Sequence, residues 1–149
     1  MSKRSTIYNT AASALLASTG INYVSKNVNE DPFAYTEDRY PAVRIFDGNE
    51  VKERFCYLGS TGQLDMKSEF ELNFTGYARE LNKSTTSLHD SLADLLSCVE
   101  VSIATDSTLL ALVQDVTLDN GRTDMGYSEG LGFVSGTFRV TYLYNHTSP

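Results

Sequence analysis

The clearest pattern in the chain is an alternation of apolar and polar residues from Gln63 to Arg79. The even positions from Leu64 to Ala78 carry mostly apolar or small side chains, whereas the odd positions are mainly charged or polar. A period of two places alternate side chains on opposite faces of an extended strand, and a helix cannot hold that pattern on one face. We therefore predict a long antiparallel strand with one face on a core and one charged face outside.

Other extended segments flank this central strand. Residues 41–46 predict a strand that starts at a proline, residues 47–49 predict a turn, and residues 51–57 predict a second, less regular strand. Residues 21–25 alternate weakly and predict a short strand. The closing segment from residue 134 onward places large side chains on one face, namely Phe138, Val140, Tyr142 and Tyr144. These segments predict the remaining strands of the sheet.

An alanine-rich segment predicts the first helix, over about residues 5–18. Ser5 or Thr6 can cap its N-terminus, and Gly20 stands where a helix typically ends. One face of this helix carries its apolar side chains, namely Ile7, Ala11, Ala14 and Leu15. The start of the chain imitates a secretory signal, but polar residues interrupt the apolar run, and we expect the helix to be retained.

The strongest helical pattern follows the central strand. Ser84 or Thr85 can cap this helix, and five apolar side chains then fall on one face, namely Leu88, Leu92, Leu95, Leu96 and Val99. We expect this stripe to cover Phe70, Leu72 and Phe74, with each buried side chain contributing roughly 1.5–3 kcal/mol. Both helices are therefore predicted to pack on the sheet.

Two further segments belong to the second half of the chain. Residues 107–113 predict a short third helix capped by Asp106 or Ser107. Residues 114–127 regain strand character around an Asn-Gly pair, which is typical of a hairpin turn. Because the flanking arms are short, this segment predicts either a small hairpin or a bulged long strand.

A long polar segment, residues 26–40, interrupts the first half of the chain. It exceeds the usual length of a connection, and such loops are often mobile or part of an interface. Its aromatic residues Phe33, Tyr35 and Tyr40 predict either an interface or local packing. Both interpretations remain open from the sequence.

Length and composition favour one α+β domain over residues 1–149, with a short polar tail at 146–149. The 149 residues are 41% hydrophobic and 21% charged, as is ordinary for a globular protein. The expected architecture is a mainly antiparallel twisted sheet with two main helices packed on it, plus a short third helix. No apolar run reaches the roughly 18 residues that a membrane helix needs, so we expect no membrane contact.

Charge and residue chemistry narrow the functional classes. A net charge of −7 disfavours a nucleic-acid binder, which normally presents a basic patch. The histidines His89 and His146 have no neighbours at catalytic or ligand spacing, and neither do the cysteines Cys56 and Cys98. The glycines at 130–136 precede a strand instead of opening a helix, which excludes a dinucleotide loop. We therefore predict no enzyme, with no catalytic, metal-binding or cofactor-binding residues.

Three carboxylates form the most ordered acidic row of the chain. Asp65, Glu69 and Glu71 share one face of the central strand with Lys67. A solvated strand face is the simplest interpretation. A functional acidic surface is the other, and the family resemblance gives it a role.

The order of elements resembles the tail terminator, or tail completion, proteins of long-tailed bacteriophages over about residues 5–145. A helix leads, the Pro41-Ala42-Val43 strand and the long alternating strand follow, and after the leucine-striped helix a glycine-punctuated segment leads to the closing Val140-Thr141-Tyr142 strand. Other phage neck and connector proteins share this size and character. The chain departs from shorter family members in its longer loop at 26–40.

The resemblance implies a structural role in the virion tail or neck, with assembly in the host cytoplasm. Such proteins form a hexameric ring on the last ring of tail-tube protein, end tube growth and offer the attachment surface for the head. The implied partners are further copies of the chain, the tail-tube protein and head–tail connector or neck proteins, and DNA passes through without specific binding. No cofactor is implied.

The acidic row fits this role, because carboxylates that face the bore would repel DNA. We hypothesise that Asp65, Glu69 and Glu71 face the bore or the tube. The alternatives are another neck or connector protein, or a small soluble ligand-binding module. The last would be distinguished by a concave apolar pocket with a few polar groups.

Overall fold

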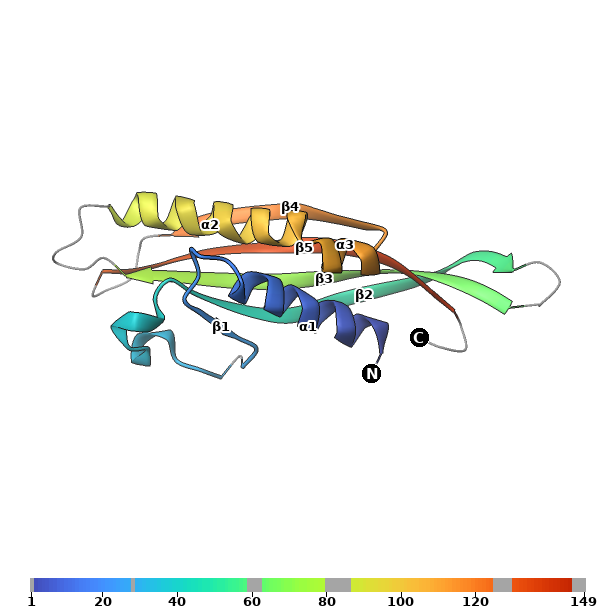
Figure 1. The fold of residues 1–149 in the computed structure, drawn as a ribbon, viewed down its shortest axis with the longest axis horizontal. Helices are drawn as coiled ribbons and strands as arrows, with labels where there is room; N and C mark the ends of the chain where they lie inside the picture. Colours follow the sequence, from blue (N-terminus) through green and yellow to red (C-terminus); the bar gives the residue numbers. More distant parts are fainter. Residues whose placement is uncertain (1, 28, 59–62, 80–86, 125–129, 146–149) are drawn as a thin grey trace.

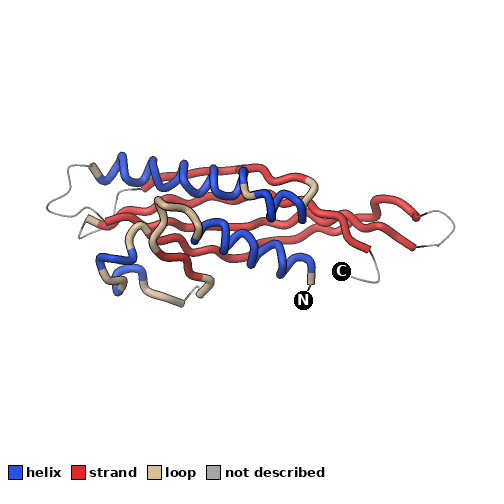
Figure 2. Tube along the Cα trace, viewed as in Figure 1, coloured by secondary structure: helices blue, strands red, loops and turns tan. Residues whose placement is uncertain are grey.

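The computed structural model describes residues 2–27, 29–58, 63–79, 87–124 and 130–145, and at 53–58, 63–65, 120, 122–124 and 145 it describes the backbone alone. Figures 1 and 2 show an elongated molecule in which helices lie along a set of long strands. In chain order, the elements are α1 Lys3–Leu16, β1 Tyr23–Ser25, the 3-10 helices η1 Pro32–Ala34 and η2 Glu37–Arg39, β2 Ala42–Leu58, β3 Gln63–Arg79, α2 Leu88–Thr105, α3 Ser107–Leu112, β4 Asp115–Asp124 and β5 Leu131–Asn145.

The strands form one five-stranded sheet in the order β1-β2-β3-β5-β4. β1 runs parallel to β2, and the other neighbours are antiparallel. The central strand β3 has the predicted bounds and pairs with β2 on one side and β5 on the other. The α+β class, the mainly antiparallel sheet, the two main helices and the short third helix are confirmed.

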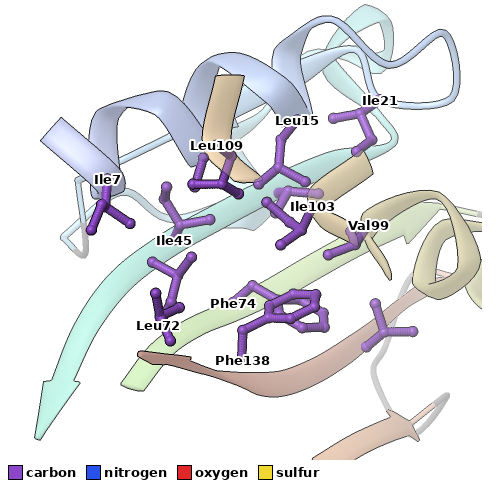
Figure 3. Packing of buried hydrophobic residues seen from close by; sticks show 14 of the residues in the cluster. Ile7, Leu15, Ile21, Ile45, Leu72, Phe74, Val99, Ile103, Leu109 and Phe138 are labelled. Carbon is purple, nitrogen blue, oxygen red and sulfur yellow. The ribbon is translucent and has the colours of Figure 1, made fainter. Parts of the chain in front are cut away.

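The main core lies between the helices and one face of the sheet. The even residues of β3 enter it, and Phe70, Leu72 and Phe74 are each at most 2% exposed. In Figure 3, Phe74 and Phe138 lie together under the helical residues, with ring centroids 5.4 Å apart. The buried side chains of α2 are Leu92, Leu95, Val99 and Ile103, so the predicted leucine stripe does cover the central strand.

A glycine permits the close approach of α2 to the sheet. An added Cβ at Gly76 would lie 2.8 Å from Leu95 Cδ2 and 2.9 Å from Val134 Cγ2. Distances below about 3 Å are too short for real Cβ contacts, so one of these neighbours would have to move. The position opposite the leucine stripe therefore requires a residue without a side chain.

The first helix begins and ends earlier than predicted. Its cap is Ser2, whose Oγ accepts a hydrogen bond of 3.1 Å from the amide of Ser5. The prediction of Ser5 or Thr6 as the cap is therefore wrong, because the hydroxyl of Ser2, earlier in the chain, is an equally good acceptor. The helix ends at Leu16, and its predicted apolar face is buried.

Gly20 does not end α1 as predicted. It lies beyond the helix, where an added Cβ would come within 2.5 Å of Cys98 Sγ on α2. The absence of a side chain at this position lets Cys98 approach closely, and the glycine does not form the helix terminus. Cys98 itself is a free cysteine of intermediate burial.

The two later helices keep their predicted positions with one change of cap. α2 starts at Leu88 and is capped by Ser87, whose side chain accepts from the amide of Asp90. The predicted caps Ser84 and Thr85 lie outside the described residues. Asp106 caps α3 through the amide of Leu109, as one of the two predictions stated.

The predicted turn at residues 47–49 is wrong, because β2 continues through it. Asp47 is opposite Leu72 and Glu50 is opposite Phe70, so Gly48 and Asn49 together face one residue of β3. This irregularity is a β-bulge, which absorbs turn-forming residues without reversing the chain. One strand of 17 residues thus replaces the two predicted strands.

Strand β4 contains a second irregularity. Its register on β5 shifts between Leu118 and Asn120, and the strand continues to Asp124. Of the two predicted alternatives, the bulged long strand is confirmed, and the Asn-Gly pair forms no hairpin turn. Residues 125–127 of the predicted segment lie outside the described residues.

Candidate functional site

The face of the sheet opposite the main core is the candidate functional surface. The helices lie along the other face (Figure 2), where the even residues of β3 are buried. The odd residues point away from that core, and those from Lys67 to Thr75 are half-buried. We call this second face the outer face. It combines a charged region, an uncharged hollow and a region covered by the loop at 26–40.

An arginine joins two strands in the charged region. Arg139 on β5 donates from Nη1 to Glu69 on β3 at 2.7 Å and from Nη2 to Asp119 on β4 at 2.9 Å. These hydrogen bonds, first that of Asp119 and then that of Glu69, raise the pKa of Arg139 above its ordinary value. All three side chains are 40–50% exposed, and exposed ion pairs contribute little to stability. The group therefore defines a charge pattern more than it holds the fold.

The predicted acidic row includes a carboxylate that is paired with a cation. Glu69 and Glu71 lie on the outer face, but Glu69 is paired with Arg139. The backbone of Asp65 pairs with Asn145, and its side chain lies outside the described residues. Arg139 and Asp119 belong to this site as well, although no sequence motif singles them out. The alternation along the closing strand already places Arg139 on the polar face. Which residues lie beside Arg139 depends on the register between the strands.

An uncharged hollow lies beside the charged region. It has a volume of about 370 Å³ and is lined chiefly by Phe46, Asn73, Thr75, Ser135 and Thr137. The Thr137 hydroxyl donates to Asn73 Oδ1 at 2.6 Å. Hydroxyl and amide groups dominate this lining, which differs from the apolar pocket that a ligand-binding module would present.

The loop at 26–40 covers the remaining end of the outer face. It buries a second, smaller apolar cluster, whose members are Tyr35, Tyr40, Ala42, Tyr77 and Leu131. Tyr35 and Tyr40 thus follow the local-packing alternative. Phe33 on η1 remains 39% exposed. The loop is a structured cover that leaves one aromatic side chain at the surface.

A carboxylate organises the loop. Glu30 accepts hydrogen bonds of 2.8 Å from the hydroxyls of both Tyr23 and Tyr35, and Arg44 Nη1 donates to its backbone carbonyl at 2.8 Å. The bond from Tyr35 is the main cause that lowers the pKa of Glu30. The guanidinium of Arg39 lies 4.5 Å above the ring of Tyr23. These contacts fix the loop on β1 and β2.

The candidate catalytic and metal-ligating residue types form no group of three in the described part of the chain. The side chain of His89 is 68% exposed, and its Nδ1 lies 3.6 Å from Asp90 Oδ1. Among the described residues, no three side chains of the metal-ligating types lie together. Within that same part, no helix combines the length and hydrophobicity needed to cross a membrane. His146 and the side chain of Cys56 lie outside the described residues.

Comparisons with known proteins find a likeness among solved structures only. No protein-family model matches the chain, and no curated protein sequence matches it. Among solved structures, the chain is similar to a chain from the virion of a native gene transfer agent particle, with 9% sequence identity. The similarity covers 92% of each chain at a TM-score of 0.38, a value too low to support an argument about function.

Proposed function

We propose that this chain is a structural protein of a phage tail or neck, which forms a hexameric ring that caps the tail tube. In this role it ends tube growth and offers the surface to which the head attaches. The proposal rests on the order of elements, which resembles tail terminator proteins. The observation that carries it is the one-sided sheet, with helices on one face and an ordered, charged outer face.

The outer face supports a position toward the bore. The described side chains of its charged region are Glu69, Glu71 and Asp119 with Arg139 and Lys67, so carboxylates outnumber cations among them. A surface with excess negative charge repels the phosphates of passing DNA. Arg139 bridges two of the carboxylates, which removes a cation that would otherwise be available to phosphate. DNA can then pass such a surface without being held.

The loop at 26–40 supports a contact with a neighbouring protein. Phe33 is exposed on a platform that Tyr35, Tyr40 and Glu30 hold in place. Exposed aromatic side chains on rigid supports are the residues that most often anchor protein interfaces. Of the three predicted interface residues, Phe33 is therefore the one that we propose to touch the tube or a neck protein.

The ring is tested by light scattering after size exclusion and by electron microscopy of the purified chain, alone and with tail-tube protein. A hexameric ring, free or bound at tube ends, is the expected result. A ring bound to a different neck component would favour the alternative of another head–tail connector protein. A monomer at all concentrations that also fails to bind tube ends would overturn the proposal.

The charge argument is tested by a paired substitution. Glu69→Lys with Glu71→Lys makes the outer face basic, and Asp90→Lys with Asp94→Lys makes the same change on exposed positions of α2. We expect the first pair to bind DNA and to slow DNA passage in assembled particles, and the second pair to leave passage unchanged. Equal effects from both pairs would show that total charge matters and not the outer face.

A further inference from the structure

Three strands extend past the helices at one end of the molecule. The C-terminal end of β2, the N-terminal end of β3 and the C-terminal end of β5 project beyond α1 and α3 (Figure 1). We call this three-stranded extension the arm. Strands with a core on one face have their register fixed by burial, whereas strands that lack such a core are prone to slip. At the base of the arm, Phe70, Tyr142 and Tyr144 still belong to the main core, so the register has to be fixed there, before the helical cover ends.

A polar cluster lies at that base, on the helical face of the sheet. Glu50 on β2 accepts hydrogen bonds from Arg4 Nη1 at 2.6 Å, from Ser68 Oγ at 2.5 Å and from the Tyr142 hydroxyl at 2.8 Å. Ser68 is 0% exposed and Tyr142 is 2% exposed. One carboxylate thus joins α1 to all three strands of the arm.

The bulge in β2 is what brings Glu50 to this face. The register before the bulge places Asp47 opposite Leu72, and its simple continuation would place Glu50 opposite Glu69 on the outer face. The inserted residue instead places Glu50 opposite Phe70, whose side chain enters the core. The bulge therefore removes a like-charge pair and supplies the carboxylate that the buried hydroxyls contact.

The N-terminus of α1 holds the arm from both sides. Arg4 also contacts Asp47 at 3.1 Å and the Gly48 carbonyl at 2.9 Å, and its guanidinium lies 5.0 Å from the Phe70 ring centroid. Lys3 Nζ donates to the Leu143 carbonyl on β5 at 2.6 Å. Two consecutive residues of one helix thus reach the two outer strands of the arm.

We propose that Arg4, Glu50, Ser68 and Tyr142 form a register lock for the arm. The lock fixes the bulge in β2 and the pairing of the three strands at the point where the helical cover ends. Satisfied buried polar groups specify one arrangement, because any slip leaves a charge or a hydroxyl without its partner. The direction of the arm is then set by α1, and the proposal does not depend on the ring.

The test is hydrogen exchange of the full chain, combined with cross-strand NMR contacts. Glu50→Gln removes the charge, Tyr142→Phe removes one hydroxyl while keeping the ring, and Glu69→Gln is the control on the opposite face. We expect amides of the arm in the first two variants to exchange about ten- to a hundredfold faster, with α2 unchanged. The contact between residues 50 and 70 should weaken as the bulge moves.

The outcomes separate a lock from general stabilisation. The proposal would be overturned if Glu50→Gln and Tyr142→Phe raised amide exchange equally in α2 and in the arm. It would also be overturned if they raised exchange in the arm no more than Glu69→Gln does. If Glu50→Gln loses the whole fold, the Tyr142→Phe variant decides by the same comparison. An unchanged contact between residues 50 and 70 in Tyr142→Phe, with unchanged exchange in the arm, would also overturn it.

Discussion

The two faces of the sheet are built from alternate residues of the same strands, yet they differ in what covers them. Under the helices, Phe70, Leu72 and Phe74 are nearly inaccessible. On the outer face, the neighbouring residues Glu69, Glu71 and others of odd number remain half-buried. The difference shows that burial in this protein follows the cover that each face receives and not the strand itself.

The covers differ in their chemistry as well. The helices bring a stripe of leucine, valine and isoleucine, and the loop at 26–40 brings tyrosines whose hydroxyls need partners. Glu30 supplies such a partner to Tyr23 and Tyr35. A leucine stripe needs only apolar surface, whereas an aromatic loop needs placed acceptors as well. The covered end of the outer face is accordingly small, and the rest stays open.

The largest expected effect is the loss of a core ring from the helical face. Phe74→Ala should lower the free energy of unfolding by about 3–5 kcal/mol, because it removes buried surface and leaves a cavity. The control Thr75→Ala, one residue away on the outer face, should cost at most about 1 kcal/mol. Urea unfolding measures both. Similar costs for the two variants would contradict the contrast between the faces.

A smaller effect should follow from adding a single methyl group under α2. Gly76→Ala places a Cβ within 2.8 Å of Leu95 Cδ2 and is expected to cost about 1–3 kcal/mol through overpacking. Urea unfolding measures the loss, and Leu95→Ala in the same chain should relieve part of it. A Gly76→Ala variant as stable as the parent would show that α2 can move away from the sheet without cost.

Alkaline pH should weaken the helical face at its polar end. Burial first, and then Glu50, raises the pKa of Tyr142 to about 12 from the ordinary value of 10.0. The neutral phenol is favoured in the fold, so its contribution is complete below pH 10.0 and is lost as the pH rises through about 12. Tyr142→Phe should therefore lose less stability than the parent between pH 10.0 and about 12 in urea unfolding. An identical decline in both would contradict this assignment.

The smallest effect is expected on the outer face. Arg139→Ala removes two exposed ion pairs, which contribute little because water and salt screen them. The unfolding midpoint should change only slightly, and less at high salt than at low salt. A large loss that salt does not reduce would mean that Arg139 holds the strands together and is not merely part of a surface charge pattern.

The sequence alone determined the elements that depend on a local period. The alternation of β3 predicts its bounds from Gln63 to Arg79, and the leucine stripe predicts the covered face of α2. The alternation along β3 also places Glu69 and Glu71 on the face that points away from the core. These features depend only on whether each side chain is apolar or polar, because burial of an apolar side chain is favourable whichever residues surround it.

Only the tertiary structure decided how those elements meet. The turn expected at residues 47–49 is a bulge, because pairing with β3 on either side outweighs the local preference of Asp-Gly-Asn. The residues beside Arg139 and Glu50 depend on the register between neighbouring strands. The sequence of one strand does not fix this register, because several alignments with the next strand keep its apolar side chains on the same face. The loop at 26–40 likewise gained its packing from Tyr77 and Leu131, which lie far from it in the chain. Local patterns fix what each segment must bury, and long-range pairing selects the partners that bury it.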